Sequence, residues 1–145
     1  MIRIVSDRQC IHQISFHEGP WESFSEITKP ASLAISFLES YFDNPLICGT
    51  LPTLPGKSPF QEKIRQTLIK LTSGSTISYS TLTERIGNPK ASRAVGRALA
   101  TNPLLILVPC HRVVGSTGNL TGFAGGMARK AWLLDHERQA VIRSG

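Results

Sequence analysis

A chain of 145 residues with 41% hydrophobic side chains is long enough to bury a core, as one ordinary domain or two small ones. No apolar run approaches the roughly 18 residues that span a bilayer, and residues 1–7 lack the long apolar segment of a signal peptide. We therefore expect a globular protein of the cytoplasm with no membrane partner. Three widely spaced cysteines, Cys10, Cys48 and Cys110, fit a reducing compartment better than a disulfide framework.

Short alternating apolar stretches predict two or three strands within residues 1–28. Gly19-Pro20 is a turn signal before the last of these stretches. The apolar residues of the three stretches are Ile2 and Ile4, then Ile11, Ile14 and Phe16, then Trp21 and Phe24. Residues 30–42 predict a helix, because Pro30 suits a first turn and four apolar side chains share one face: Leu33, Phe37, Leu38 and Tyr41. Pro45 ends this helix.

Prolines and glycines crowd residues 46–59, which predicts a linker and places a domain boundary after Pro55. The two sides of this boundary differ in charge. Residues 1–55 hold three basic and six acidic side chains, whereas residues 56–145 hold 13 basic and four acidic ones, a net charge of +9. This division favours a polyanion-binding module after a neutral or acidic one, although basic residues that only solubilise a surface would give the same composition.

Three helices are predicted in the basic part. Residues 59–72 carry Phe60, Ile64, Leu68 and Leu71 at helical spacing. A shorter helix is capped by Ser80 or Thr81, with capping-box spacing over residues 81–84, and stops at residues 87–89. A third runs from residue 90 to residue 101. The second and third of these helices, joined by a turn that contains glycine, have the outline of a helix-turn-helix. The same outline also occurs where two helices only pack a core.

The third helix is made almost entirely of small residues, which let its backbone come close to whatever lies against it. A tightly packed internal helix and a helix that enters a narrow groove are both consistent with this composition. Recognition helices of the major groove carry long polar side chains, and this helix has few of them. Its small residues are Ala91, Ser92, Ala94, Gly96, Ala98 and Ala100.

Cys110 follows the apolar run at residues 104–108 and lies between Pro109 and His111. A thiol beside an imidazole can be a nucleophile, because the thiolate is the reactive form and a neighbouring base or cation raises its population. A buried structural cysteine is the alternative. An isolated Cys-His pair favours that alternative, since nucleophile and base usually meet in space and not in sequence.

The surrounding string reverses this preference. Pro109-Cys110-His111-Arg112-Val113 is followed by Gly-Phe-Ala-Gly-Gly at residues 122–126 and by Lys-Ala-Trp-Leu-Leu at residues 130–134. Over about residues 54–137 the chain closely resembles the O6-alkylguanine-DNA alkyltransferases, the methylated-DNA--protein-cysteine methyltransferases. The resemblance implies direct-reversal DNA repair, in which the alkyl group of O6-alkylguanine, and of O4-alkylthymine, moves from duplex DNA to Cys110. No cofactor is implied, and the reaction is a single-turnover suicide reaction because a thioether is not hydrolysed by a positioned water.

The resemblance also implies an α+β fold in two parts. Residues 1–55 form a shortened ribonuclease-H-like α/β domain with its linker, and residues 56–145 form a mostly helical, winged-helix-like domain that contains the helix-turn-helix. The protein is expected to be a monomer, nucleoid-associated in the cytoplasm of a prokaryote or nuclear in a eukaryote. Arg65 stands where the family often carries a tryptophan, so packing around it is expected to differ.

Five residues receive catalytic roles from the resemblance. His111 is the base that acts on Cys110 through a water, and Glu137 orients the imidazole, as in a Cys-His-acid triad. Tyr79 rotates the 3′ phosphate and donates a proton toward the departing guanine, whose anion is otherwise a poor leaving group. Asn102 is a hinge that joins the small-residue helix to the active-site segment. From the sequence alone, Tyr79 would be a core aromatic and Glu137 a surface charge.

The DNA contacts are implied in the minor groove, where small residues fit and sequence readout is poor. A repair protein must work in any sequence context, so poor readout suits the task. The residues at this contact are Ala91, Ser92, Ala94 and Gly96. Arg93 is implied as a finger that fills the stack when the damaged nucleotide rotates out, a rotation that gives the thiol access to the lesion. Arg97 is expected to be solvated.

The substrate pocket is implied at Val113, Phe123, Ala124, Gly125 and Lys130. The glycine-rich residues 118–126 form its wall and lid. Phe123 replaces a common tyrosine and Ala124 replaces a possible serine, so two potential hydroxyl contacts to the lesion are lost. Lys130 is expected to contact the backbone on the thiol side or the lid, with a phosphate contact as the alternative.

Two other functions remain open at this point. A non-enzymatic lesion sensor would bind O6-alkylguanine and recruit repair factors, but such proteins lack the cysteine. A helix-turn-helix regulator with a buried Cys110 would instead bind DNA according to base sequence. Cys10, His12 and His17 lie near one another, but their spacing matches no standard zinc pattern and no fourth ligand is evident, so no metal is expected.

Overall fold

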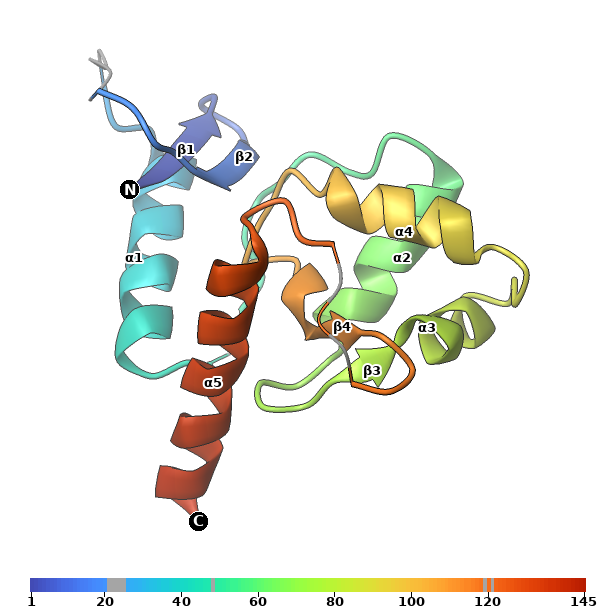
Figure 1. Cartoon of the computed structure of the whole chain (residues 1–145). Coiled ribbons are helices and arrows are strands. Elements are labelled where there is room, and N and C mark those ends of the chain that lie inside the picture. Colours follow the sequence, from blue (N-terminus) through green and yellow to red (C-terminus); the bar gives the residue numbers. More distant parts are fainter. Residues whose placement is uncertain (21–25, 48, 119, 121) are drawn as a thin grey trace.

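The computed structural model describes residues 1–20, 26–47, 49–118, 120 and 122–145. Trp21, Phe24 and Cys48 lie outside the described residues, so the expectations that involve them stay predictions. The described part is mixed α/β, mostly helical with two small sheets (Figure 1). Its elements are β1 (Ile2–Ser6), β2 (Ile11–Phe16), α1 (Lys29–Asp43), α2 (Pro59–Ile69), β3 (Ile77–Ser78), α3 (Tyr79–Arg85), α4 (Ser92–Ala100), the 3-10 turn η1 (Cys110–Arg112), β4 (Val113–Val114) and α5 (Met127–Ser144).

Strands β1 and β2 form an antiparallel hairpin, which confirms two strands at the start of the chain. A two-stranded hairpin is only marginally stable alone and needs an apolar partner. Helix α1 is that partner, with Thr28 as its N-cap and Pro30 in its first turn. Its buried face differs from the predicted one, because Ala34 is fully buried while Leu33 is exposed. The buried residues of α1 are Pro30, Ala34, Leu38 and Tyr41.

The described residues 46–47 and 49–58 belong to no helix or named strand, and Pro59 is the first residue of α2. Part of this segment lies against the hairpin. The backbone of Ile11 bonds with Pro52 and Leu54, while Ile14 bonds with residues 103–105, the segment that follows α4. One hydrophobic cluster contains side chains from β2, α1, the C-terminal helices and the segment before Cys110. The first third of the chain therefore shares a continuous core with the rest.

The basic part holds the predicted helices with shifted ends. Helix α2 begins at Pro59 under a Ser58 cap and ends at Ile69, earlier than predicted. The predicted cap of α3 is wrong: Ser78 accepts the hydrogen bond of the Thr81 N–H, so α3 begins at Tyr79. Helix α4 covers residues 92–100 only. Between α3 and α4 the chain turns at Gly87, whose φ of +77° belongs to the left-handed region that glycine enters most readily.

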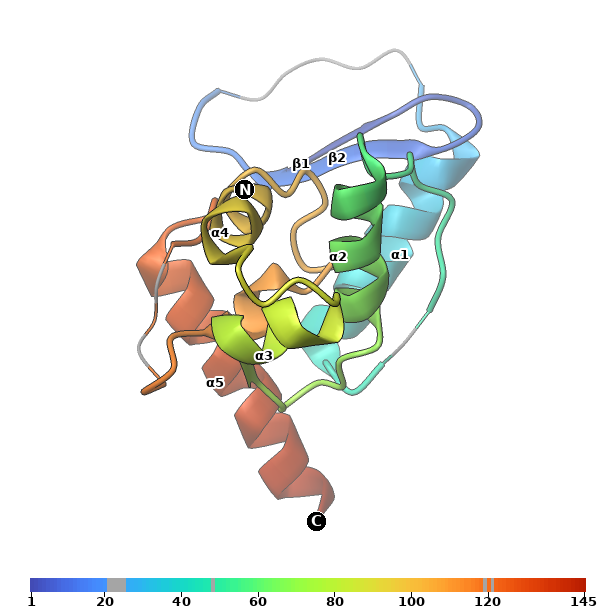
Figure 2. The ribbon, with the colours of Figure 1, turned by 90° about the vertical axis from the view of Figure 1, so that its right-hand side faces the viewer.

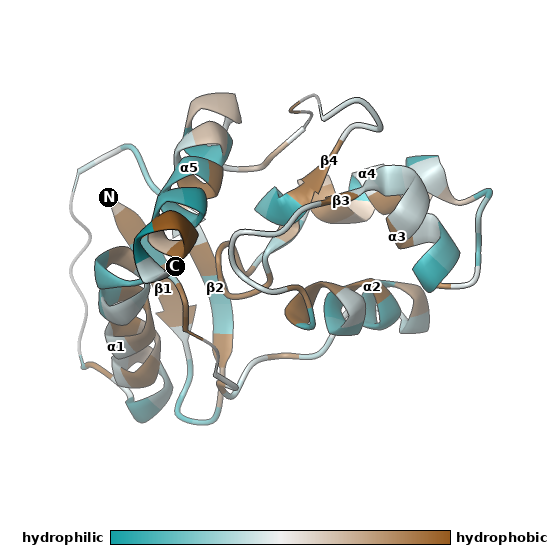
Figure 3. Cartoon of the chain, turned by 90° about the horizontal axis from the view of Figure 1, so that it is seen from below, coloured by the Kyte–Doolittle hydropathy of each residue, from teal (hydrophilic) through white to brown (hydrophobic). Residues whose placement is uncertain are grey.

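The C-terminal helix α5 lies beside α1, as two views of the ribbon agree (Figures 1 and 3). Helices α2, α3 and α4 form the other side of the molecule (Figure 2). Between these two sides, β3 pairs in parallel with β4, which joins the start of α3 to the segment after Cys110. Within the described residues, none of the helices combines the length and apolar character that a membrane span requires.

Candidate active site

The thiol of Cys110 is buried, at 3% exposure, on the 3-10 turn η1. It is fixed from the end of α4 by Asn102, whose side-chain amide donates to the Val108 carbonyl at 2.9 Å and to Cys110 Sγ at 3.1 Å. The Asn102 side-chain oxygen in turn accepts the backbone N–H of Leu104 at 3.0 Å. These contacts join the small-residue helix to the active-site segment, the geometry that the hinge prediction required.

The segment that leads to Cys110 is strained. Ile106 has a φ of 73°, the only positive φ of a non-glycine residue in the described part of the chain. A β-branched side chain is a genuine outlier in this region, since its Cβ crowds the backbone. Ile106 is held there because its side chain is buried in the core and the backbone around it is bonded. Such strain clusters at active sites, where surrounding packing over-determines the conformation.

His111 and Glu137 meet in the interior, as predicted. His111 Nε2 lies 2.7 Å from Glu137 Oε1, and both side chains are fully buried. An imidazole that donates Nε2–H to a carboxylate keeps Nδ1 unprotonated. Nδ1 of His111 is buried with no hydrogen-bond partner among the described residues, which leaves it free to take a proton.

Arg112 is the partner of this carboxylate that the sequence did not indicate. Its guanidinium donates to both oxygens of Glu137, from Nε at 2.9 Å and from Nη2 at 2.8 Å. It also donates to the Leu71 carbonyl and the Ser73 hydroxyl. The bidentate pair balances a charge that would be expensive to bury alone. Because Arg112 belongs to the Pro-Cys-His-Arg string, its adjacency to His111 was the available signal, but its role depends on where α5 packs.

The pKa values of the three groups follow from these contacts. Burial raises the pKa of the Cys110 thiol, against the lowering effects of the Asn102 hydrogen bond and the Lys130 charge. Burial also lowers the pKa of His111, so its imidazole is neutral near pH 7. Burial alone would raise the pKa of Glu137, but the bonds and charges of His111 and Arg112 outweigh it and lower that pKa to about 2. The resting site is a thiol beside a neutral base and an ionised acid.

Several of the predicted pocket residues contact this group or its neighbours. Lys130 is fully buried on α5 and donates to the Val113 carbonyl at 2.7 Å, the thiol-side backbone contact that was expected. The Phe123 ring stands edge-on to the His111 ring, 6.5 Å between centroids. Gly125 is buried behind it, and an added Cβ would lie 2.7 Å from both the Phe123 ring and the Phe16 ring. Any larger residue at this position would therefore force one or both rings to move.

Two further predicted site residues, Tyr79 and Ala124, are less buried than the residues around Cys110. Tyr79 is half-buried at the first position of α3, directly after the strand that pairs with β4. Ala124 is exposed. The roles of Tyr79 and Ala124 stay predictions.

The small residues of helix α4 and its N-cap are exposed or half-buried, and two of them, Ala91 and Ala98, also pack against the core. Val95 and Leu99 anchor it in the core, while Arg93 and Arg97 extend from its exposed side. This excludes the reading of α4 as a wholly internal helix. The small residues that are exposed or half-exposed are Ala91, Ser92, Ala94, Gly96, Ala98 and Ala100.

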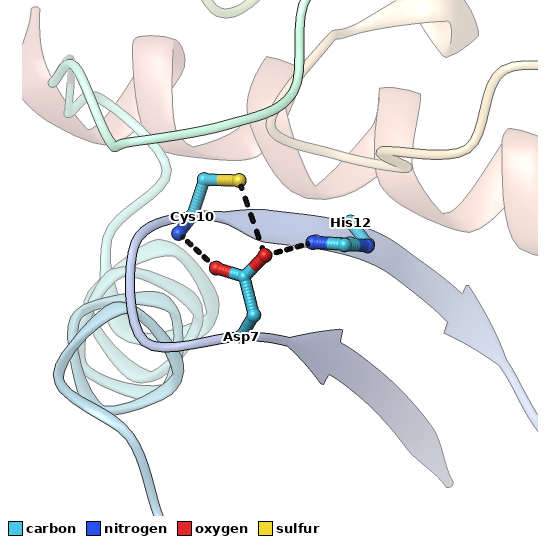
Figure 4. A group of neighbouring side chains, drawn as sticks. All are labelled: Asp7, Cys10 and His12. Atoms are coloured by element: carbon cyan, nitrogen blue, oxygen red, sulfur yellow. Dashed lines mark hydrogen bonds and ion pairs between the residues drawn. The ribbon is translucent and has the colours of Figure 1, made fainter.

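The cluster of possible metal ligands differs from the one considered in the sequence. Asp7, not His17, joins Cys10 and His12 at the hairpin turn (Figure 4). His12 Nε2 lies 2.7 Å from Asp7 Oδ2, and the other Asp7 oxygen accepts the Cys10 backbone N–H. The bonds from Cys10 and His12 lower the pKa of Asp7 to about 2. These contacts connect the two sides of the hairpin turn.

The Cys110 thiol, with a base beside it, lies on the segment that follows helices α3 and α4, and the exposed side of α4 carries small and basic residues. This arrangement defines a class of proteins that bind DNA and react through a cysteine. Comparison with known proteins places the chain within that class. Residues 59–139 match the family model of the 6-O-methylguanine DNA methyltransferase DNA-binding domain.

Relatives that match most of the chain support the same family. The chain is 39% identical over 152 residues to the methylated-DNA--protein-cysteine methyltransferase of Shigella flexneri, covering 92% of the chain and 89% of the relative. The Salmonella typhimurium protein of the same name is 44% identical over 126 residues, covering 87% and 72%. The crystal structure of Mycobacterium tuberculosis OGT in complex with DNA matches with a TM-score of 0.84 at 31% identity, covering 96% and 87%. The chain belongs to the methylated-DNA--protein-cysteine methyltransferase family.

Proposed function

We propose that this protein repairs DNA by direct reversal, transferring the alkyl group of O6-alkylguanine in duplex DNA to Cys110. The observation that carries the proposal is the buried Cys110 thiol, bonded to Asn102 beside the His111–Glu137 pair. Family membership supports alkyl transfer to a cysteine, and the DNA complex of the Mycobacterium tuberculosis relative supports DNA as the partner. The cysteine separates this function from that of a non-enzymatic lesion sensor.

In the proposed chemistry, His111 Nδ1 takes the Cys110 proton through a water, and Glu137 stabilises the imidazolium that forms. The thiolate electron pair then forms an S–C bond to the alkyl carbon as the C–O6 bond breaks. The electrons of that bond stay with guanine, and Tyr79 donates a proton to the guanine ring, to be replaced later from solvent. The products are a thioether on Cys110 and unmodified guanine. Each molecule acts once, and O4-alkylthymine is a second substrate by the same displacement.

DNA is proposed to bind across the exposed face of α4 in the minor groove. The small side chains allow close approach, and Arg93 extends from this face with the reach to occupy the space of a flipped nucleotide. The pocket for the flipped base is assigned to Val113, Phe123, Ala124, Gly125 and Lys130. Arg97 contacts phosphates or solvent.

The finer description of the fold is also a proposal. The hairpin with α1 is interpreted as a shortened ribonuclease-H-like domain within residues 1–55, and the two-residue β3–β4 ladder beside α3 and α4 as the remnant wing of a winged-helix domain within residues 56–145. The protein is proposed to act as a monomer in the cytoplasm, on the nucleoid in a prokaryote, or in the nucleus of a eukaryote.

The test is incubation with a duplex that carries one O6-methylguanine, followed by measurement of the intact protein mass. We expect one methyl group per molecule, mapped to the Cys110 peptide, and no further repair when lesion is in excess. Cys110→Ala should lose transfer and keep DNA binding, whereas Cys10→Ser, at the distant hairpin turn, should repair normally. Sustained turnover, or transfer that persists in Cys110→Ala, would contradict the proposal.

A further inference from the structure

We infer that Tyr41, from helix α1 near the start of the chain, is a positioning residue for the alkyl-transfer site. Its phenol is buried, at 2% exposure, and donates to Glu137 Oε1 at 2.8 Å. The inference rests on the proposed function, because Glu137 matters to the reaction only if His111 is the base. It assigns to the N-terminal part of the chain a contact with the catalytic group, in addition to its packing role.

The acceptor atom is the important detail. Glu137 Oε1 accepts from Tyr41, from His111 Nε2 at 2.7 Å and from Arg112 Nη2 at 2.8 Å. The second oxygen accepts from Arg112 Nε at 2.9 Å and from the backbone N–H of Gly74 at 3.2 Å. An ionised carboxylate offers about four lone-pair sites, so five donors leave it no freedom to rotate. The phenol and the imidazole therefore compete for the same oxygen.

Tyr41 is itself held firmly in this place. On α5, one residue before Glu137, His136 Nε2 lies 2.9 Å from the Tyr41 backbone carbonyl. The His136 ring also stands edge-on to the phenol, with 5.5 Å between centroids. Burial, followed by the neighbouring Glu137 charge, raises the pKa of Tyr41 far above its usual range. The phenol thus keeps its proton at every pH at which the protein works, and it is a permanent donor to Glu137.

This sharing has a consequence for the base. A hydrogen bond from the phenol draws negative charge away from Oε1 and so weakens the pull of Glu137 on the proton of His111. Without the hydroxyl, Oε1 would attract that proton more strongly, and the pKa of His111 would rise. The other charged groups that act on His111 are Arg112 and Lys130, and both oppose protonation. Tyr41 therefore acts in the same direction as these two cations while carrying no charge.

Tyr41→Phe removes the hydroxyl and keeps the ring. We expect single-turnover repair of an O6-methylguanine duplex to slow about tenfold on the acid side of the pH–rate profile, where the higher pKa leaves less of His111 as the neutral base, and to change little near pH 7, where the imidazole stays neutral. The acid limb of the pH–rate profile should move up by about one pH unit, the scale of one hydrogen bond to a charged group. An NMR titration of the His111 ring should show the same upward movement of its pKa.

Leu38→Val is the matched control, because Leu38 is buried one turn earlier on α1 and is purely apolar. It should lower the melting temperature and leave the acid limb in place. If Tyr41→Phe also leaves both the limb and the His111 titration unchanged, Tyr41 only packs the core and the inference is overturned. If the wild-type protein transfers no methyl group, the proposed function fails, and the inference fails with it.

A second variant keeps the inference testable should Tyr41→Phe not fold. Replacing Tyr41 with 3-fluorotyrosine retains the ring and hydroxyl but makes the phenol a stronger donor. More charge is then drawn from Glu137 Oε1, so the acid limb and the His111 pKa should both move down. Movement in the opposite direction, or no movement, would overturn the inference, since core packing is almost the same in this variant.

Discussion

At the scale of single residues, the resting thiol is protected by its own surroundings. Burial raises the pKa of Cys110, so the thiolate forms only when a base takes the proton. His111 is neutral for the same reason, and it can accept that proton because Glu137 stays ionised beside it. A buried thiol of this kind reacts slowly with solutes that cannot enter the site. Reactivity is thus confined to an alkyl group that is delivered to it.

Replacing Arg93 tests whether the damaged nucleotide reaches the thiol by rotating out of the duplex. We expect Arg93→Ala to slow repair in duplex DNA about tenfold or more, because a flipped nucleotide costs a few kcal/mol of stacking and pairing that the guanidinium would partly offset. A free O6-substituted guanine base has no stack to leave, so its reaction rate should hardly change. Single-turnover rates on both substrates measure this difference.

Arg97→Ala is the control for charge, since Arg97 is also exposed on α4, one turn further along. Arg97→Ala should weaken DNA binding modestly, because attraction to a phosphate is lost. It should leave the rate of alkyl transfer from already bound duplex unchanged. Equal slowing of duplex and free base by Arg93→Ala would make Arg93 a pocket or structural residue, and its assignment as a finger would be withdrawn.

At the scale of elements, the N-terminus of α3 fixes where Tyr79 stands. Ser78 caps this helix and also forms part of β3, which pairs with β4 directly after the active-site turn. We expect Ser78→Ala to lower the free energy of unfolding by about 1 kcal/mol, the usual cost of a lost N-cap. Urea unfolding measures it. Ser80→Ala removes an exposed hydroxyl that lies 3.0 Å from Ser78 Oγ and caps no backbone N–H of α3, so it should cost only a few tenths. A larger loss for Ser80→Ala would contradict this cap.

The same helix shows what the sequence could and could not predict. Thr81 begins a string with capping-box spacing, yet the pairing of β3 with β4 selects Ser78 as the cap. On α1, the periodic pattern predicted a helix correctly, but the packing of the folded chain buries Ala34 and leaves Leu33 exposed. Local pattern therefore locates these helices, whereas their ends and faces depend on neighbours that are distant in sequence.

At the scale of the whole molecule, the active site combines a local string with distant partners. The string around Cys110 was sufficient to indicate the nucleophile, its base and the family. Glu137 was found only through the resemblance, since an isolated helical glutamate carries no signal. Tyr41 bonds to Glu137 across 96 residues of sequence, and the sequence indicated no more than its place on a helix face. Contacts of this kind require the packing of α1 against α5, which no local pattern encodes.

The buried charges of the site should govern how stability depends on pH. The pKa of Glu137 falls from 4.5 to about 2 on folding, so its contribution is complete above pH 4.5 and is lost as the pH falls toward 2. That shift corresponds to about 3 kcal/mol. His111 acts in the same direction: folding lowers its pKa below 6.5, so the unfolded chain binds a proton that the folded one excludes. For Tyr41 folding raises the pKa, so stability is lost above about pH 10.

We therefore expect the free energy of unfolding to be nearly constant between about pH 7 and pH 9, above which the raised pKa of the Cys110 thiol begins to lower it, and to fall below pH 6.5, with a second loss below pH 4.5. Urea titrations from about pH 9 down to about pH 3 measure the curve. Glu137→Gln leaves Arg112 without its counter-charge, so its stability should be lower throughout and its curve flatter below pH 4.5. Glu84→Gln, which changes an exposed carboxylate on α3, should keep the wild-type shape. An unchanged acid limb in Glu137→Gln would show that other groups control acid unfolding, and the ionised, arginine-bound state of Glu137 would be contradicted.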